Sequence, residues 1–312
     1  MKTFLMGALL ALALPLTPPE AVSGTIQGRW FLDFDRSDGQ AQLTMKRTGV
    51  RGSWNSSHGV ALSDFRGLTR PSGTADVPAR FSLVRDAGTI TFDGQLDAAG
   101  GSGKFTFAAA PGFAAAMASA GVGNLDEEQV FSAAVHDVSR QLVGELKAFG
   151  YDRLSFDGLV SMRIHGAGPE FIRELKALGY EGLSADQLVS MRIHGATASF
   201  IRDLQALGYS HLSPDNLVSL RIHGATPEYV KEIKELGYER ISSDQLVSVR
   251  IHGVTPEYIR GLAELGYRRV PVDELVSMRI HGVTLEFVKK MQALDPRVSP
   301  DDLVNKRIHS RS

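Results

Sequence analysis

The segment LVSMRIHG at Leu188–Gly195 decides the fold, because the same eight residues recur along the chain. Identical copies stand at Leu159–Gly166 and Leu275–Gly282, and near-copies begin at Leu217 and Leu246. Histidines at the equivalent position are spaced by 29 residues, and the last comes one residue early: His136, His165, His194, His223, His252, His281 and His309. A fixed period of this length is typical of repeat proteins in which each unit is one supersecondary element.

The repeat extends upstream into weaker sequence. Pro111, Phe113 and Met117 lie two periods before Pro169, Phe171 and Leu175. Seven units therefore fill about 111–309, and the first is the least similar to the others.

Each unit is predicted to form two short antiparallel helices. In one first helix, Thr226 is the expected N-cap, Pro227 the first helical residue, and Gly237 the stop. The second helix opens with a predicted capping box, either Ser184 with Gln187 or Ser242 with Gln245. Helices of about ten residues are marginal alone, so stability must come from stacking on neighbouring units. In the last unit Lys306 replaces an apolar residue, as the end of a stack requires.

The front of the chain has a different pattern. Period-two alternation with turn signals, as in Ala41, Leu43 and Met45, predicts six to eight antiparallel strands between about residues 24 and 109. Trp30 and Trp54 are expected in the core, with a ligand-lining role as the alternative. The fold class is therefore α+β multidomain, a small antiparallel β-barrel or sandwich (24–109) followed by an α-solenoid of seven two-helix repeats (110–312).

Residues 1–23 read as a secretory signal peptide. Lys2 precedes a 13-residue apolar run, Phe4–Leu16, which is short for a membrane-spanning helix. The sequence leaves an uncleaved interfacial anchor open as the alternative. We therefore expect a secreted or periplasmic protein with no membrane span after signal removal.

A helical projection separates the two conspicuous residue types of the segment. With Leu188 at zero, Arg192 falls at about 40°, inside the apolar arc, and Ile193 at about 140°. The arginines are therefore predicted to have a structural role between repeats, with helix C-terminal carbonyls or carboxylates as acceptors: Arg163, Arg192, Arg221, Arg250 and Arg279. The leucine, valine, methionine and isoleucine of the segment are expected in the core, so that only its serine and histidine point outward.

The outward residues predict a polar stripe that binds a partner, with a merely solvated face as the alternative. Its candidate residues are Asp186, Ser190, His194, Asp215, Ser219, His223, Asp244, Ser248 and His252. The helical half has 23 Lys and Arg against 26 Asp and Glu, which argues against a nucleic-acid partner. A protein or peptide is the partner that we expect.

Catalytic and metal-dependent chemistry has little support in the sequence. The absence of cysteine excludes disulfides and thiolate zinc sites. Equivalent histidines on helices about 8–10 Å apart cannot share an ion whose ligands lie at about 2 Å. Asp186, Ser190 and His194 place serine in the middle, whereas a catalytic triad needs histidine there. We predict a non-enzyme with no cofactor, although a pair of catalytic carboxylates stays open.

The repeat resembles a known pattern. The stretches TPEYVKEIKELGY and LSADQLVSMRIHG, with GSWNSSHGVALSDFRGL in the front half, resemble bacterial envelope proteins. Some of those carry a membrane metallopeptidase domain of the beta-lactam-sensor type, of which this chain has no motif. The resemblance implies an accessory binding module of the envelope and transfers no catalytic or zinc residue. The alternative function is an envelope sensor whose β-domain binds a small apolar ligand.

Overall fold

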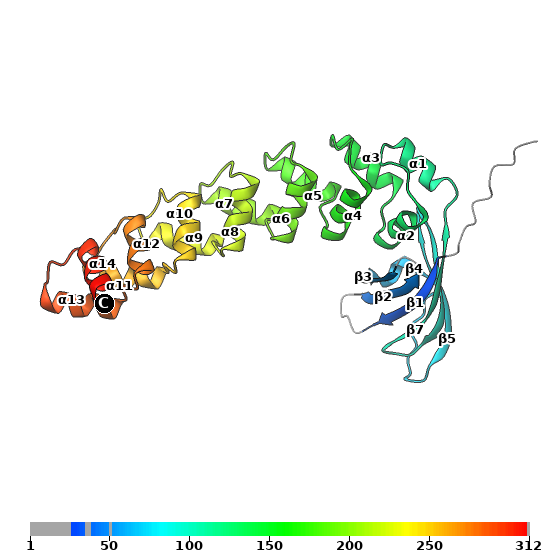
Figure 1. Cartoon of the computed structure of the whole chain (residues 1–312), viewed down its shortest axis with the longest axis horizontal. Coiled ribbons are helices and arrows are strands. Elements are labelled where there is room, and N and C mark those ends of the chain that lie inside the picture. Colours follow the sequence, from blue (N-terminus) through cyan, green and yellow to red (C-terminus); the bar gives the residue numbers. More distant parts are fainter. Residues whose placement is uncertain (1–25, 35–38, 50–51, 311–312) are drawn as a thin grey trace, which may run out of the picture. The chain divides into compact units, whose positions relative to one another are not determined.

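The computed structural model describes residues 26–34, 39–49 and 52–310. The predicted signal peptide therefore lies outside the described residues. The chain is α+β, and its described part holds an antiparallel seven-stranded sheet followed by fourteen α-helices (Figure 1). Contacts divide it into two compact units, one up to Leu83 with Ile90–Ala108, the other Val84–Thr89 with the chain from Ala109 onward. The predicted boundary at 109/110 lies beside this division, but the short segment Val84–Thr89 was not expected to group with the helices.

The first unit is a single sheet that curls into a half-barrel, and not two packed sheets. Its strands are β1 (Gln27–Asp33), β2 (Gln40–Gly49), β3 (Gly52–Ala61), β4 (Phe65–Arg66), β5 (Val77–Arg85), β6 (Gly88–Leu96) and β7 (Gly100–Ala109). Their order is β3-β2-β1-β7-β6-β5-β4, so the first and last strands pair at the centre. Every other neighbour in the sheet is consecutive in sequence, which is the arrangement that successive hairpins produce.

Alternating residues build the core of the sheet. Ala41, Leu43 and Met45 of β2 are fully buried, as their period-two pattern predicted. Trp30 is also fully buried, and its ring contacts Phe81 and Phe92 edge-on at 5.2 and 6.1 Å between centroids. The expectation of a core role is therefore confirmed for Trp30, whereas Trp54 of β3 is only half-buried.

We take the described helices of the second unit in seven consecutive pairs, each an odd helix and the even helix after it, and call each pair a hairpin. Their helices are α1 (Phe113–Ser119), α2 (Glu127–His136), α3 (Arg140–Ala148), α4 (Phe156–His165), α5 (Pro169–Ala177), α6 (Ala185–Ile193), α7 (Ala198–Ala206), α8 (Pro214–Ile222), α9 (Pro227–Glu235), α10 (Ser243–Ile251), α11 (Pro256–Glu264), α12 (Val272–Ile280), α13 (Leu285–Leu294) and α14 (Pro300–His309). Each even helix contacts the next even helix, and each odd helix contacts the next odd one (Figure 1). The described helices therefore lie in two rows, one of even helices and one of odd helices.

The helix ends form as their sequences predict. Thr226 caps α9 by accepting a hydrogen bond from the backbone of Tyr229, with Pro227 as the first residue of the helix. Capping boxes with Ser184 and Ser242 open α6 and α10. Gly237 has a φ of 99°, in the left-handed region that a residue with a Cβ rarely adopts. Lys306 in the last hairpin is exposed, as expected for the end of a stack.

Candidate partner-binding surface

The residues of the predicted stripe lie at different depths along each even helix. Asp186 is exposed in the first turn of α6, Ser190 is half-buried, and His194 is exposed as the C-cap. The same order holds on α8 and α10, where Ser219 and Ser248 are half-buried and His252 is less exposed than His223. Aspartate and histidine are eight residues apart, about 12 Å along a helix. They therefore stand at opposite margins of the surface and do not form one compact site.

One prediction was wrong: the isoleucines of the segment are not in the core. Their exposed fractions are similar in five hairpins, at Ile164 55%, Ile193 53%, Ile222 56%, Ile251 54% and Ile280 54%. Leu188 and Met191 already fill the inter-helix contact of α6, being 1% and 0% exposed. Ile193 is the last residue of the helix, and its projected angle of about 140° borders the polar side. This border position is the one indication in the sequence that the isoleucine side chain could be exposed.

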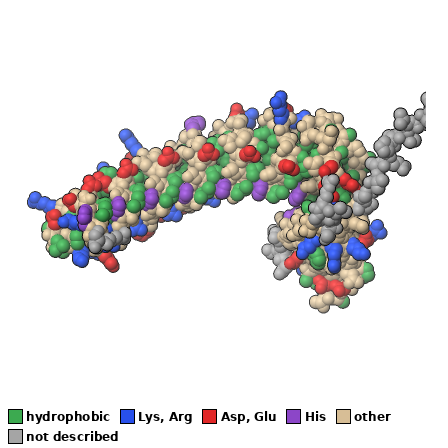
Figure 2. Space-filling model, viewed as in Figure 1, with side chains coloured by type: hydrophobic (Ala, Val, Ile, Leu, Met, Phe, Trp, Pro, Cys, Tyr) green, Lys and Arg blue, Asp and Glu red, His purple; other side chains and the backbone are tan. Residues whose placement is uncertain are grey.

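The exposed isoleucines and the histidines that follow them form one continuous margin, which we call the Ile/His edge. It consists of Ile164, His165, Ile193, His194, Ile222, His223, Ile251, His252, Ile280 and His281. Figure 2 shows histidine and hydrophobic side chains alternating along this margin of the helical unit. In the first hairpin the equivalent Val135 is 3% exposed, and burial lowers the pKa of His136. The edge therefore begins at the second hairpin.

The arginines lie beside this edge and contact two hairpins each. The guanidinium of Arg192 lies 4.8 Å from the ring centroid of Phe171 in its own hairpin. Its Nε donates to the carbonyl of His165 in the preceding hairpin at 3.4 Å. Arg250 repeats both contacts, at 4.6 Å from the Tyr229 ring and 3.4 Å from the carbonyl of His223. An arginine thus covers the free carbonyl end of the helix before it.

The other members of this arginine row vary. Arg221 and Arg279 stack on Phe200 and Tyr258, each at 4.9 Å from the ring centroid. Within the described part of the chain, the buried Nε of Arg279 has no hydrogen-bond partner. Arg163, at the start of the row, pairs with the carboxylate of Asp137, which has a φ of 55° where later hairpins have glycine. Several of these side chains stay exposed, Arg192 and Arg221 among them, so their stems are less buried than the projection indicated.

A second set of hydrogen bonds joins neighbouring hairpins through the tyrosines that follow the odd helices from α3 to α11. The hydroxyls of Tyr151 and Tyr209 donate to the carbonyls of Leu183 and Ile241, both at 2.6 Å. Tyr238 and Tyr267 make the same bond at 2.8 and 2.7 Å. Tyr180 is the exception, because its buried hydroxyl has no hydrogen-bond partner among the described residues.

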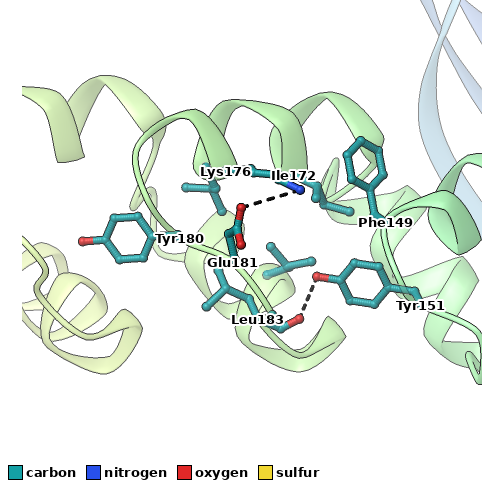
Figure 3. A pocket seen from close by; sticks show the side chains of 10 residues that line it. Phe149, Tyr151, Ile172, Lys176, Tyr180, Glu181 and Leu183 are labelled. Atoms are coloured by element: carbon teal, nitrogen blue, oxygen red, sulfur yellow. Dashed lines mark hydrogen bonds and ion pairs between the residues drawn. The ribbon is translucent and has the colours of Figure 1, made fainter.

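A pocket of about 150 Å³ lies beside one of these joints (Figure 3). Phe149, Tyr151 and Ile172 line it together with Lys176 and Glu181, whose charged groups pair at 3.6 Å. At the equivalent position Gln205 and Lys234 donate instead to a carbonyl of the preceding hairpin, at 3.2 and 2.5 Å. At this joint Lys176 forms an ion pair with Glu181 and, among the described residues, does not donate to the preceding hairpin. The charged groups that line the pocket are therefore already paired with each other.

The sheet carries a different polar feature on its outer face. Arg29 of β1 is directly opposite Lys46 of β2 and Lys104 of β7, and all three are exposed. Arg29 and Lys46 lie 5.8 and 5.4 Å from the ring centroid of Phe31, which is 38% exposed. Within the described ranges no carboxylate pairs with these three cations.

Two other kinds of feature are absent from the described residues. No helix in the described part of the chain is long and apolar enough to cross a membrane. No group of three or more His, Asp or Glu side chains among the described residues is arranged to hold a metal ion. Comparison with known proteins found no matching family model, no matching curated protein and no matching solved structure. The resemblance to envelope repeat proteins therefore stays a prediction.

Proposed function

We propose that the helical unit is an α-solenoid of seven two-helix repeats that binds a protein or peptide along the Ile/His edge, without catalysis. The observation that carries this proposal is the row of five isoleucines, each 53–56% exposed, at one position of successive repeats. Single exposed apolar residues are ordinary on protein surfaces, but a contiguous apolar row marks an interaction site.

The free energy gained by covering exposed isoleucines is substantial only when several of them are covered together. Covering the exposed half of one isoleucine is worth about 1 kcal/mol, since full burial is worth about 1.5–3 kcal/mol. Five such residues supply about 5 kcal/mol before the entropic cost of association. A long partner that covers several repeats is therefore favoured over a compact one that covers one or two.

Contacts between neighbouring hairpins hold successive helices, and with them the edge, in place. Arg192 and Arg250 each tie the end of one even helix to the next hairpin. The hydroxyls of Tyr151, Tyr209, Tyr238 and Tyr267 each tie one loop to the next. Both sets of contacts are local, between neighbours only, as in other repeat proteins. The aspartates of the predicted stripe, such as Asp186 and Asp215, stand at the far margin, so we place them at the rim of the binding surface.

The test is selection of peptides from a random displayed library on the immobilised full chain. Selected peptides should bind at least tenfold more weakly when Ile193, Ile222 and Ile251 are all replaced by serine. Replacement of Arg173, Arg202 and Lys231 by serine, on the opposite row of helices, is the matched control and should leave binding unchanged. Equal binding to both variants would refute the edge as the binding surface.

The histidines are tested separately. Alanine at His194, His223 and His252 should weaken the same selected peptides, because these rings are the polar neighbours of the isoleucines. Thermal unfolding must be unchanged in each variant, which the exposure of the substituted side chains leads us to expect.

We also propose that the protein is exported to the periplasm or beyond. The apolar run Phe4–Leu16 after Lys2 supports this, because it has the length of a signal peptide. N-terminal sequencing of the protein recovered from the cell envelope tests it: a start near residue 24 is expected, and recovery from the cytosol alone would contradict export.

A further inference from the structure

The Ile/His edge has a regular period that restricts the shape of its partner. Successive even helices contact one another from α4 to α12, and packed helices lie about 8–10 Å apart. Each step carries one exposed isoleucine, followed by one histidine. A partner that uses several steps must therefore present an apolar side chain about every 8–10 Å.

Three regular peptide conformations can be compared with this period. A polyproline II helix advances about 9.3 Å in three residues, which is one turn. An extended strand shows one face every two residues, about 6.6 Å, and so falls short. An α-helix repeats a face after seven residues, about 10.5 Å, just beyond the range. The period thus favours polyproline II, with one apolar residue in three.

Hydrogen bonding favours the same conformation. A polyproline II segment makes no internal hydrogen bonds, so its carbonyl groups need donors, whereas the backbone of an α-helix is already paired. The edge supplies donors at its central steps. Arg192 is exposed, and only its Nε bonds within the described chain, so its terminal nitrogens remain available. His194 and His223 are exposed beside the isoleucines and add ring nitrogens.

The charge of the arginines beside the edge favours particular residues at the positions of the partner between its apolar side chains. Each step of the edge brings one guanidinium, whereas the aspartate of the same helix stands about 12 Å away at the other end. Guanidinium groups pair well with carboxylates, so the exposed guanidinium groups of Arg192 and Arg221 favour acidic side chains.

We propose that the Ile/His edge binds an acidic polyproline II segment with an apolar residue at every third position. This inference rests on the proposed function and adds the conformation, spacing and charge of the partner. Five isoleucines from Ile164 to Ile280 match a segment of about 13 residues, since four turns of about 9.3 Å separate five contacts.

The experiment measures binding of labelled synthetic peptides to the full chain by fluorescence anisotropy. The test peptide repeats Leu-Pro-Glu five times. A matched peptide of identical composition has its leucines at spacings of two and four, and a third carries leucines at heptad spacing in a helix-forming sequence. We expect the three-residue repeat to bind at least tenfold more tightly than the other two, and to lose at least tenfold when Ile193, Ile222 and Ile251 become serine.

The outcomes separate this inference from the proposed function. Equal binding of the two matched peptides, tighter binding of the helical peptide, or no binding of any of them would overturn the polyproline II partner. In each of these cases, library-selected peptides that still depend on the three isoleucines would leave the proposed function standing. If no selected peptide depends on those isoleucines, both proposals fail.

Discussion

The two units of this chain use aromatic residues differently, and the difference follows from how each fold is held together. Both tryptophans, Trp30 and Trp54, belong to the sheet unit, while all seven tyrosines of the sequence lie in the helical hairpins. The sheet has a single core, in which large apolar rings such as Trp30 are buried. That core depends on pairing between strands distant in sequence, β1 and β7. Neighbouring hairpins are joined by polar contacts, and a tyrosine hydroxyl provides one at four of these joints.

This comparison teaches where a repeated surface can arise. A feature that depends on one hairpin and its neighbour, such as the exposure of Ile222, recurs whenever the hairpin recurs. A feature of the sheet, such as the row of Lys46, Arg29 and Lys104, occurs once because the strands around it are all different. Tryptophan fluorescence and helical circular dichroism therefore report on the two units separately.

The largest expected effect is alkaline unfolding of the helical unit. Burial raises the pKa of Tyr209, Tyr229, Tyr238 and Tyr258 to about 12, against an ordinary value of about 10. A raised folded-state pKa means that the neutral phenol stabilises the fold fully below pH 10 and that this contribution is lost as the pH rises through 12. Helical circular dichroism should therefore fall between pH 10 and 12.

Tryptophan fluorescence of the same sample is the internal control, because the sheet unit contains no tyrosine. We expect the fluorescence transition at a higher pH than the helical one. Loss of the tryptophan signal first would contradict the assignment of this pH dependence to the tyrosines.

The next effect is confined to the sheet. Phe92 is fully buried and stacks on Phe81 at 4.9 Å between ring centroids. Phe92→Ala should lower the free energy of unfolding of this unit by about 3–5 kcal/mol, measured by urea titration of tryptophan fluorescence. Phe31→Ala, on the exposed face, is the matched control and should cost about 1 kcal/mol or less. Similar losses for both would mean that the sheet has no single buried face.

Much of the fold follows from the sequence because its determinants are local. The period of 29 residues, the capping serines and the proline and glycine punctuation set the helix boundaries, and the alternation in β2 sets its buried face. The curl of the sheet and the pairing of β1 with β7 are long-range outcomes that no short pattern encodes. The grouping of Val84–Thr89 with the helices is also a long-range outcome. Asp86 in this segment forms an ion pair with Arg140, whose guanidinium lowers the pKa of the Asp86 carboxyl.

The candidate surface was predicted only in part for a related reason. A helical projection gives the direction of Ile193 but not the extent of the neighbouring helix, and α6 ends at that residue. Its side chain therefore extends past the packed contact, where Met191 is the last buried residue. The helical projection correctly places His194 in solvent but places Ile193 in the core. The border between buried and exposed positions depends on how the neighbouring helices pack, which the projection does not include.

The arginine row offers a test of the helical joints. Arg221→Met combined with Arg250→Met removes two ring contacts and the donor to the carbonyl of His223. Each cation–π contact of this kind is worth about 1 kcal/mol, so the pair should cost about 2 kcal/mol in urea unfolding followed at 222 nm. Arg202→Met, an exposed residue of α7, should change stability by less than about 0.5 kcal/mol. Unchanged stability of the double variant would remove the arginines from the account of the joints.

A pair of tyrosines gives a smaller and sharper effect. Tyr209→Phe deletes a hydroxyl that donates to the carbonyl of Ile241 at 2.6 Å and should cost about 1 kcal/mol. Tyr180→Phe deletes a buried hydroxyl without a partner and should be neutral or stabilising. Both variants remove one tyrosine hydroxyl at equivalent positions of successive hairpins. An equal loss of unfolding free energy in both would show that the hydrogen bond of Tyr209 contributes nothing.

The smallest effect returns to the sheet and has the opposite sign. Like charges directly opposite on neighbouring strands destabilise a sheet, and Lys46, Arg29 and Lys104 face one another in register. Lys46→Glu should therefore stabilise the sheet unit by about 0.5 kcal/mol, seen as a later urea midpoint in tryptophan fluorescence. Lys46→Gln removes the repulsion without adding an attraction and should give a smaller gain. A loss of stability in Lys46→Glu would show instead that the contact of Lys46 with the Phe31 ring outweighs the repulsion, because that contact is the favourable interaction which glutamate removes.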